Sequence, residues 1–111
     1  GPNGPFKIGL NEVAIGLTIP HYGIELARAR LTPSWFNHAT LTGKLYTPGE
    51  AQVAGFVDEI VEAQAIGDVA LSQARQLTKI DLAAHAATKL RVRRHALEAI
   101  RKLHAEEFAA V

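Results

Sequence analysis

A lone carboxylate within an apolar stretch is the residue of this chain best suited to chemistry. Glu12 lies in the segment NEVAIGLTIP, which runs from Asn11 to Pro20, with Leu10 before it and Val13 directly after it. The ionised form of a carboxyl group is poorly hydrated in such surroundings, so the group can both give and take a proton near neutral pH. Glu12 is therefore a candidate general acid or base. The alternative is a solvated or salt-bridged carboxylate at a turn.

The elements that must position Glu12 are short. Residues 6–17 are β-prone and punctuated by two glycines, which predicts a strand followed by a turn. Residues 24–31 then present a short helical face. Thr32 followed by Pro33 predicts the start of a second helix, because proline suits the first helical position.

The rest of the chain is predicted to be mostly helical. The sequence TPGE at 47–50 has the form of a capping box, and it opens a brief helix that should end at Gly55. Residues 56–61 are apolar enough for a short buried strand. Apolar residues then recur every three or four positions over 66–84 and again over 90–103, which predicts two amphipathic helices. The fold class is mainly α with a few short strands.

Two motifs in a fixed order carry a family resemblance. The first is IGLNEVAIGLTIP at residues 8–20, and the second is LTGKLYTPGEAQVAGFVDEIV at residues 41–61. Together they resemble the second half of the crotonase (enoyl-CoA hydratase/isomerase) family, over roughly residues 6–62. The positions that match the family pattern are Ile8, Gly9, Glu12, Gly16, Pro20, Leu41, Gly43, Ala51, Ala54, Gly55, Phe56, Val57 and Asp58.

The chain departs from the family pattern at two places. Asn11 stands where members usually have proline, and asparagine does not fix φ as proline does. His21, Tyr22 and Gly23 replace a small, glycine-rich turn, and they put polar rings beside what the resemblance implies is the acyl pocket. His21 and Tyr22 are therefore candidate substrate-binding residues, with an ordinary surface turn as the alternative.

The resemblance implies a fold and a mechanism. The fold would be the C-terminal half of a crotonase (ClpP/crotonase-like) α/β spiral, with part of the core in residues 1–62 and a helical region in 63–111 that covers the site and forms oligomers. Glu12 would be the family's second acid/base, which exchanges a proton with the α-carbon of a thioester while an oxyanion hole holds the enolate. The partner glutamate and the oxyanion donors would precede Phe6, so we expect a fragment that is inactive on its own.

The resemblance also implies partners. The substrate would be a coenzyme A thioester of fatty acid metabolism, with no further cofactor, and the protein would be a homo-oligomer, either a trimer or a dimer of trimers. Hydration and isomerisation of an enoyl-CoA both remain open. A different class of function is also open, namely a non-catalytic helical assembly module in which Glu12 is a relic.

Composition argues against several other classes. With 12 basic and 11 acidic residues the net charge is +1, so no strong field draws the chain to nucleic acid or anionic lipid. The basic residues do gather in the last third of the chain. They form either the solvated face of an amphipathic helix or a phosphate contact to coenzyme A, and no aromatic stacking platform for nucleic acid accompanies them. These residues are Lys89, Arg91, Arg93, Arg94, Arg101 and Lys102.

We expect no metal site and no membrane partner. His85, His95 and His104 do not share one face of a helix, as metal ligands would need to. The chain has no cysteine, which suits a cytoplasmic protein. No apolar run approaches the roughly 20 residues of a membrane span, and no signal-peptide pattern is present.

Overall fold

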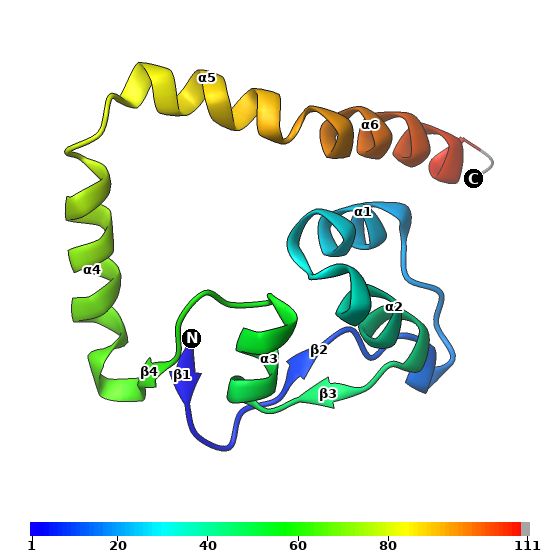
Figure 1. Cartoon of the computed structure of the whole chain (residues 1–111). Helices are drawn as coiled ribbons and strands as arrows, with labels where there is room; N and C mark the ends of the chain where they lie inside the picture. Colours follow the sequence, from blue (N-terminus) through cyan, green and yellow to red (C-terminus); the bar gives the residue numbers. More distant parts are fainter. Residues whose placement is uncertain (110–111) are drawn as a thin grey trace.

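Figure 1 shows the computed structural model of the chain, which describes residues 1–109. Its first half is a small packed unit of short strands and helices, and its second half is a chain of longer helices that arches away and returns. The elements in order are β1 (Pro2–Asn3), β2 (Ile8–Gly9), the 3₁₀ turn η1 (Val13–Ile15), α1 (His21–Arg30), α2 (Pro33–Thr42), β3 (Leu45–Tyr46), α3 (Pro48–Ala54), β4 (Val61–Glu62), η2 (Ala63–Ala65), α4 (Ile66–Leu77), α5 (Leu82–Val92) and α6 (Arg94–Phe108).

The strands form two separate pairs. β1 runs parallel to β4, whereas β2 is antiparallel to β3 with Ile8 opposite Tyr46 and Gly9 opposite Leu45. The second pair brings the segment that leads into Glu12 against the segment that follows α2. The predicted strand and turn over residues 6–17 are confirmed as β2 and η1.

Local signals set the starts of two helices. Pro33 occupies the first turn of α2, directly after Thr32, as predicted. The capping box before α3 is also confirmed: the Thr47 hydroxyl accepts from the Glu50 backbone N–H at 3.3 Å, and the Thr47 N–H donates to the Glu50 carboxylate at 3.1 Å. Gly55 ends α3 in the left-handed conformation, with φ of 105°.

The core is centred on one aromatic ring. Tyr46 is completely buried, and the fully buried alanines Ala39 and Ala51 lie in the same cluster on α2 and α3. Because alanine has only a methyl side chain, the helices can approach the ring closely. Six partly buried residues complete the cluster: Ile8, Leu10, Trp35, Phe36, Phe56 and Val57.

The last three helices form the arch. In Figure 1, α4 leads away from the packed unit, α5 crosses at a distance from it, and α6 returns to lie along α1 in the opposite direction. The ends of α1 and α6 are joined where the His21 backbone N–H donates to the Glu107 carboxylate at 3.2 Å. Within residues 1–109 no helix is both long and apolar enough to cross a membrane.

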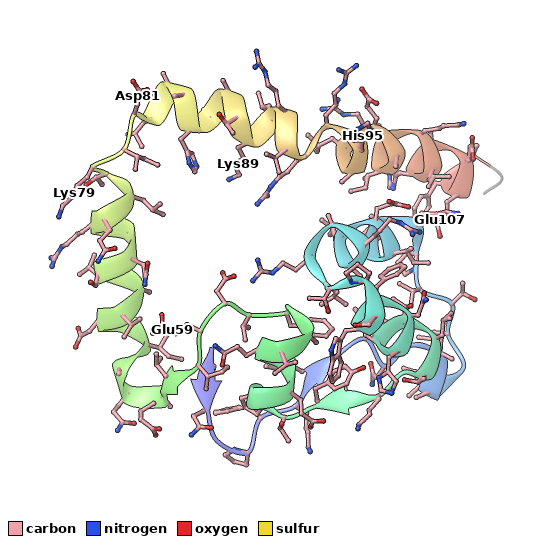
Figure 2. All side chains as sticks on the ribbon, in the orientation of Figure 1. Glu59, Lys79, Asp81, Lys89, His95 and Glu107 are labelled. Carbon is pink, nitrogen blue, oxygen red and sulfur yellow. The ribbon has the colours of Figure 1, made fainter. Side chains whose placement is uncertain are left out.

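The prediction of one helix over residues 66–84 is wrong, because the chain turns at 78–81. The Thr78 hydroxyl donates to the Arg75 carbonyl oxygen at 2.6 Å and ends α4. Asp81 then caps a new helix, since its side chain accepts from the Ala84 N–H at 2.9 Å. Figure 2 shows Lys79 and Asp81 at the corner between α4 and α5.

Two other predicted elements have different bounds. The expected strand over 56–61 is irregular except at Val61, because Phe56 and Val57 pack against the core as parts of a loop. The expected helix over 90–103 is wrong as a single element. α5 already begins at Leu82, and the backbone at Arg93, with φ of −96° and ψ of 4°, separates it from α6.

Candidate functional site

The backbone around Glu12 forms a tight turn. The Glu12 carbonyl oxygen accepts hydrogen bonds from the N–H groups of Ile15 at 3.0 Å and Leu17 at 2.8 Å. Gly16 closes the turn in the left-handed conformation, with φ of 81°, and its N–H donates to the Val13 carbonyl oxygen at 3.3 Å. The turn therefore fixes the position from which the Glu12 side chain departs.

That side chain reaches a cavity between α1 and α6, which we call the Glu12 cavity. Its volume is about 740 Å³. One carboxylate oxygen of Glu12, Oε2, is buried and has no hydrogen-bond partner among residues 1–109. A buried carboxylate oxygen without a protein partner is available to exchange a proton with a ligand. The apolar wall includes Leu10, Ile19, Leu31, Phe56, Leu97 and Ile100.

Two arginines supply positive charge at the wall of the Glu12 cavity. The Arg30 guanidinium is paired with the Asp58 carboxylate at 2.7 Å, on the loop after α3. Arg93 lies at the junction of α5 and α6, and no carboxylate of residues 1–109 lies within ion-pair distance of it. The cavity therefore combines one potential proton carrier with an apolar wall and a cation.

The structure separates the two predicted substrate-binding residues. Tyr22 lines the Glu12 cavity from the first turn of α1. His21, its neighbour, is exposed and does not line this cavity. Contact with substrate stays a prediction for both residues, with a geometric basis for Tyr22 alone.

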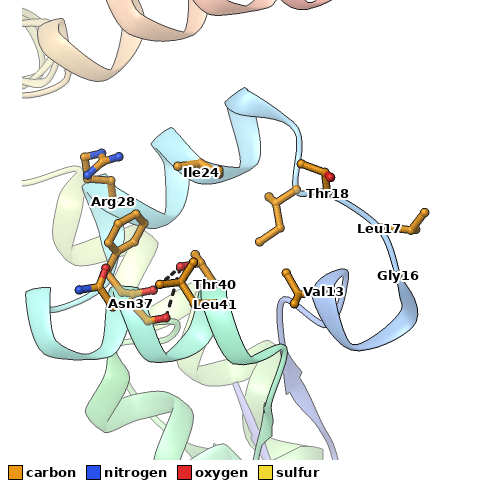
Figure 3. Close-up of a pocket in the computed structure, with 11 residues that line it drawn as sticks. Val13, Gly16, Leu17, Thr18, Ile24, Arg28, Asn37, Thr40 and Leu41 are labelled. Carbon is orange, nitrogen blue, oxygen red and sulfur yellow. Dashed lines mark hydrogen bonds between the residues drawn. The ribbon is translucent and has the colours of Figure 1, made fainter.

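A second hollow borders the turn that follows Glu12, where Val13 and Gly16 line it (Figure 3). It has a volume of about 570 Å³ and lies between η1, α1 and α2. Arg28 stands over the ring of Phe36 there, 4.7 Å from its centroid, and Thr40 donates its hydroxyl to the Phe36 carbonyl oxygen. Glu12 does not line this hollow, so the hollow lacks the carboxylate that lines the first cavity.

Most of the predicted basic cluster is exposed on α5 and α6. Arg94 is paired with Glu98 one turn along α6, at 3.0 Å. Figure 2 shows Lys89 near the end of α5 and His95 at the start of α6. Arg93 is the member of this cluster that also lines the Glu12 cavity. Within the described part of the chain, no three His, Cys, Asp or Glu side chains are grouped so as to hold a metal, and the absence of a metal cofactor stays a prediction.

The sequence singles out Glu12 as a candidate, but it does not indicate the side of the cavity that α6 supplies. Helical spacing predicts Leu97 and Ile100 on one apolar face of an amphipathic helix, but the pattern does not indicate what that face covers. In the sequence Arg93 is one of several basic residues. No local signal distinguishes it from its neighbours, because its place depends on the return of α6 to α1.

Comparison with known proteins places the chain in a family. The sequence model of the enoyl-CoA hydratase/isomerase family matches residues 4–109. The chain therefore belongs to this family, also called the crotonase family, and the resemblance in its two motifs is confirmed. No curated protein sequence matches the chain.

Solved structures of the same family share this fold. An enoyl-CoA hydratase/isomerase family protein from Pseudomonas syringae superposes with a TM-score of 0.90 at 46% identity, and the match covers 93% of this chain and 45% of that one. An enoyl-CoA hydratase from Mycobacterium marinum gives 0.86 at 39% identity, covering 92% and 45%. Human mitochondrial delta3-delta2-enoyl-CoA isomerase gives 0.83 at 27% identity, covering 90% and 39%. The chain thus spans less than half the length of these proteins.

Proposed function

We propose that this chain supplies one catalytic carboxylate and part of the acyl pocket of an enzyme that acts on an enoyl-CoA thioester, either a hydratase or an isomerase. The single observation that carries the proposal is the buried, unpartnered Oε2 of Glu12 on the wall of a largely apolar cavity. Family membership supports the class of substrate. The names of the solved relatives include both a hydratase and an isomerase, so both reactions stay in the proposal.

In the proposed reaction Glu12 transfers a proton at the α-carbon of the thioester. Proton transfer at this carbon passes through an enolate, whose negative oxygen needs hydrogen-bond donors to stabilise it. During isomerisation the double bond moves as one proton leaves and another is returned. During hydration, water adds at the β-carbon and the α-carbon receives a proton. The apolar wall would hold the acyl chain and exclude competing water.

We also propose that the chain is the C-terminal half of the enzyme and that the other half completes the site. Two observations support this. The match covers only 45% of each of two solved relatives, and the two motifs follow in the order of the second half of the family pattern. The 111-residue chain alone should then show no hydration or isomerisation of a short enoyl-CoA. In the full-length protein, Glu12→Gln should remove most of kcat while the fold is kept, because glutamine has a similar shape but cannot carry the proton. An unchanged kcat would show that Glu12 is not the acid/base.

Assembly into a homo-oligomer, a trimer or a dimer of trimers, is part of the same proposal. Large apolar side chains are exposed on the arch: Leu71 and Leu77 on α4 are 50% and 53% exposed, and Leu90 and Val92 on α5 are 65% and 75% exposed. Such surfaces are unfavourable in water unless they are covered. The same exposed apolar side chains favour the alternative of a non-catalytic assembly module. That alternative would be excluded if the full-length protein is active and Glu12→Gln abolishes the activity. We further propose a cytoplasmic location, which the absence of cysteine supports.

A further inference from the structure

The four residues that follow α2, Gly43 to Tyr46, contact the chain on both sides of Glu12. We call them the 43–46 segment. Before Glu12, β2 pairs with β3, so that Gly9 lies opposite Leu45. After Glu12, the turn η1 lies against the end of α2. Both contacts are made through a glycine.

The contact after Glu12 involves Gly43 and Ala14. Gly43 ends α2 with φ of 67°, in the left-handed region that favours glycine. A Cβ atom at this position would lie 2.7 Å from the backbone nitrogen of Ala14 and 2.8 Å from its Cβ. Any side chain at residue 43 would therefore push directly on the backbone of η1, which begins immediately after Glu12.

The contact before Glu12 is also a close approach at a glycine, Gly9, but this glycine is not in the left-handed conformation. A Cβ atom on Gly9 would lie 2.7 Å from the carbonyl oxygen of Lys44 and 3.1 Å from the Leu45 side chain. The atom approached most closely is again a backbone atom. A rotamer change cannot relieve such an overlap, so the backbone would have to shift.

The 43–46 segment is itself held in place by the core. The Tyr46 side chain is fully buried, and its hydroxyl is 2.5 Å from Nδ1 of His38 on α2. The Lys44 ammonium lies 3.7 Å from the Glu50 carboxylate at the start of α3. Glu12 is thus carried on a short stretch of backbone between two points that are pressed against an anchored segment.

We infer that the 43–46 segment is a clamp that sets the position of the Glu12 carboxylate, with Gly43 and Gly9 as positioning residues. The inference rests on the proposed function of Glu12. Catalysis by a general acid or base is sensitive to placement, because a group displaced by about 1 Å can lose about 100-fold in rate. The clamp would act on kcat and leave substrate binding nearly intact, since much of the cavity wall belongs to α1 and α6.

Steady-state kinetics of four variants of the full-length protein would test this. Gly43→Ala and Gly9→Ala should each lower kcat by about 100-fold with KM near that of the wild type. Gly16→Ala is the matched control for backbone strain. Gly16 has φ of 81° and closes the turn after Glu12, but a Cβ there would meet no described atom within 4 Å apart from its chain neighbours. Its loss of kcat therefore measures strain within that turn alone and should be smaller than the losses at residues 43 and 9. Glu12→Gln is assayed beside them.

The results separate the clamp from the proposed function. If Glu12→Gln lowers kcat strongly but Gly43→Ala and Gly9→Ala lower it no more than Gly16→Ala, the clamp is refuted and the function stands. The clamp would also be refuted if the glycine variants lose kcat/KM only through a rise in KM, with kcat unchanged. If Glu12→Gln has no effect, the proposed function fails first.

Urea unfolding tests the contact between Gly43 and Ala14 without an activity assay. Ala14→Gly removes the methyl group that a Cβ at residue 43 would meet, although the Ala14 nitrogen remains. The double variant of Gly43→Ala with Ala14→Gly should therefore recover part of the urea midpoint lost by Gly43→Ala, relative to Ala14→Gly alone. Strictly additive losses would overturn the contact on which the clamp depends.

Discussion

The hydrogen bond between Tyr46 and His38 gives a sharp test of how the core is held. Tyr46 is buried beneath α2 and α3, whereas His38 is on the exposed side of α2. The Tyr46 ring makes edge contacts with Trp35, at a centroid distance of 5.5 Å, and lies 6.0 Å from Phe56. Tyr46→Phe keeps these contacts and removes only the hydroxyl. His38→Phe keeps a ring of similar size over that hydroxyl but removes its nitrogen partner.

The two changes should have unequal costs. In Tyr46→Phe the freed His38 nitrogen is on the exposed side and can bind water, so the free energy of unfolding should fall by about 0.5–1.5 kcal/mol. In His38→Phe the Tyr46 hydroxyl would stay covered without its partner, which costs about 1–3 kcal/mol. The double variant replaces both polar partners by apolar rings and should cost less than His38→Phe alone. Removal of the whole ring in Tyr46→Ala should cost about 3–5 kcal/mol.

Urea unfolding of the full-length protein at pH 7, followed by circular dichroism, would measure these differences. We expect His38→Phe, at the exposed histidine, to lower the free energy of unfolding more than Tyr46→Phe at the buried tyrosine. The loss in the double variant should be well below the sum of the two single losses. Equal single costs that add in the double variant would show that the hydrogen bond does not stabilise the core.

The same pair predicts a dependence on alkaline pH. Burial, reinforced by the charge of Glu50, raises the pKa of Tyr46 above its ordinary value of 10.0. A raised pKa in the folded state favours the protonated form, so this contribution is complete below pH 10 and is lost as the pH rises through the folded pKa. The wild type should therefore lose stability above pH 10 more steeply than Tyr46→Phe. Parallel curves for the two proteins would contradict the buried position of the hydroxyl.

Two further predictions concern helix starts. Hydrogen bonds from the Thr47 backbone and then from the Thr47 side chain, with Lys44 nearby, lower the pKa of Glu50 from its ordinary value of 4.5. The contribution of Glu50 to stability is therefore present above pH 4.5 and is lost as the pH falls through the folded pKa. Wild type and Glu50→Ala should differ in urea midpoint at pH 7, and the gap should shrink as the pH falls below 4.5 and through the folded pKa; a constant gap would count against the capping box. Asp81→Ala should weaken α5 by about 1 kcal/mol, seen as faster hydrogen exchange over residues 82–92. Asp81→Asn should keep most of the protection, because asparagine can also cap.

Local signals predicted the turn after Glu12 and the starts of the next helices well. The turn after Glu12, the proline at the start of α2 and the capping box of α3 all depend on a few neighbouring residues, and each appears in the structure at the expected place. The break between α4 and α5 was missed for a related reason. Apolar residues continue in helical spacing through 78–81, and the pattern outweighed the capping potential of Asp81. A periodic pattern indicates which face of a helix is apolar, but it is a weaker guide to where one helix ends.

Contacts between distant segments could not be predicted in the same way. The closeness of Gly43 to Ala14 depends on how α2 ends relative to η1, and nothing in either segment alone requires a glycine for that purpose. The family pattern marked Gly9 and Gly43 as matching positions without giving a reason. The two distances of 2.7 Å supply one, because each glycine is a place where two backbones meet.

The return of α6 has the largest consequence for the chemistry proposed for Glu12. A carboxylate beside α1 would be an ordinary solvated group if that face were open to water, and its proton would exchange with solvent instead of substrate. α6 covers this face with Leu97 and Ile100, and the exposed link between His21 and Glu107 joins the helices only near one end. The apolar contacts must therefore provide most of the closure, since burial of apolar surface scales with area whereas an exposed polar contact contributes little. The proton transfer proposed for Glu12 thus depends on the packing of a helix more than eighty residues farther along the chain.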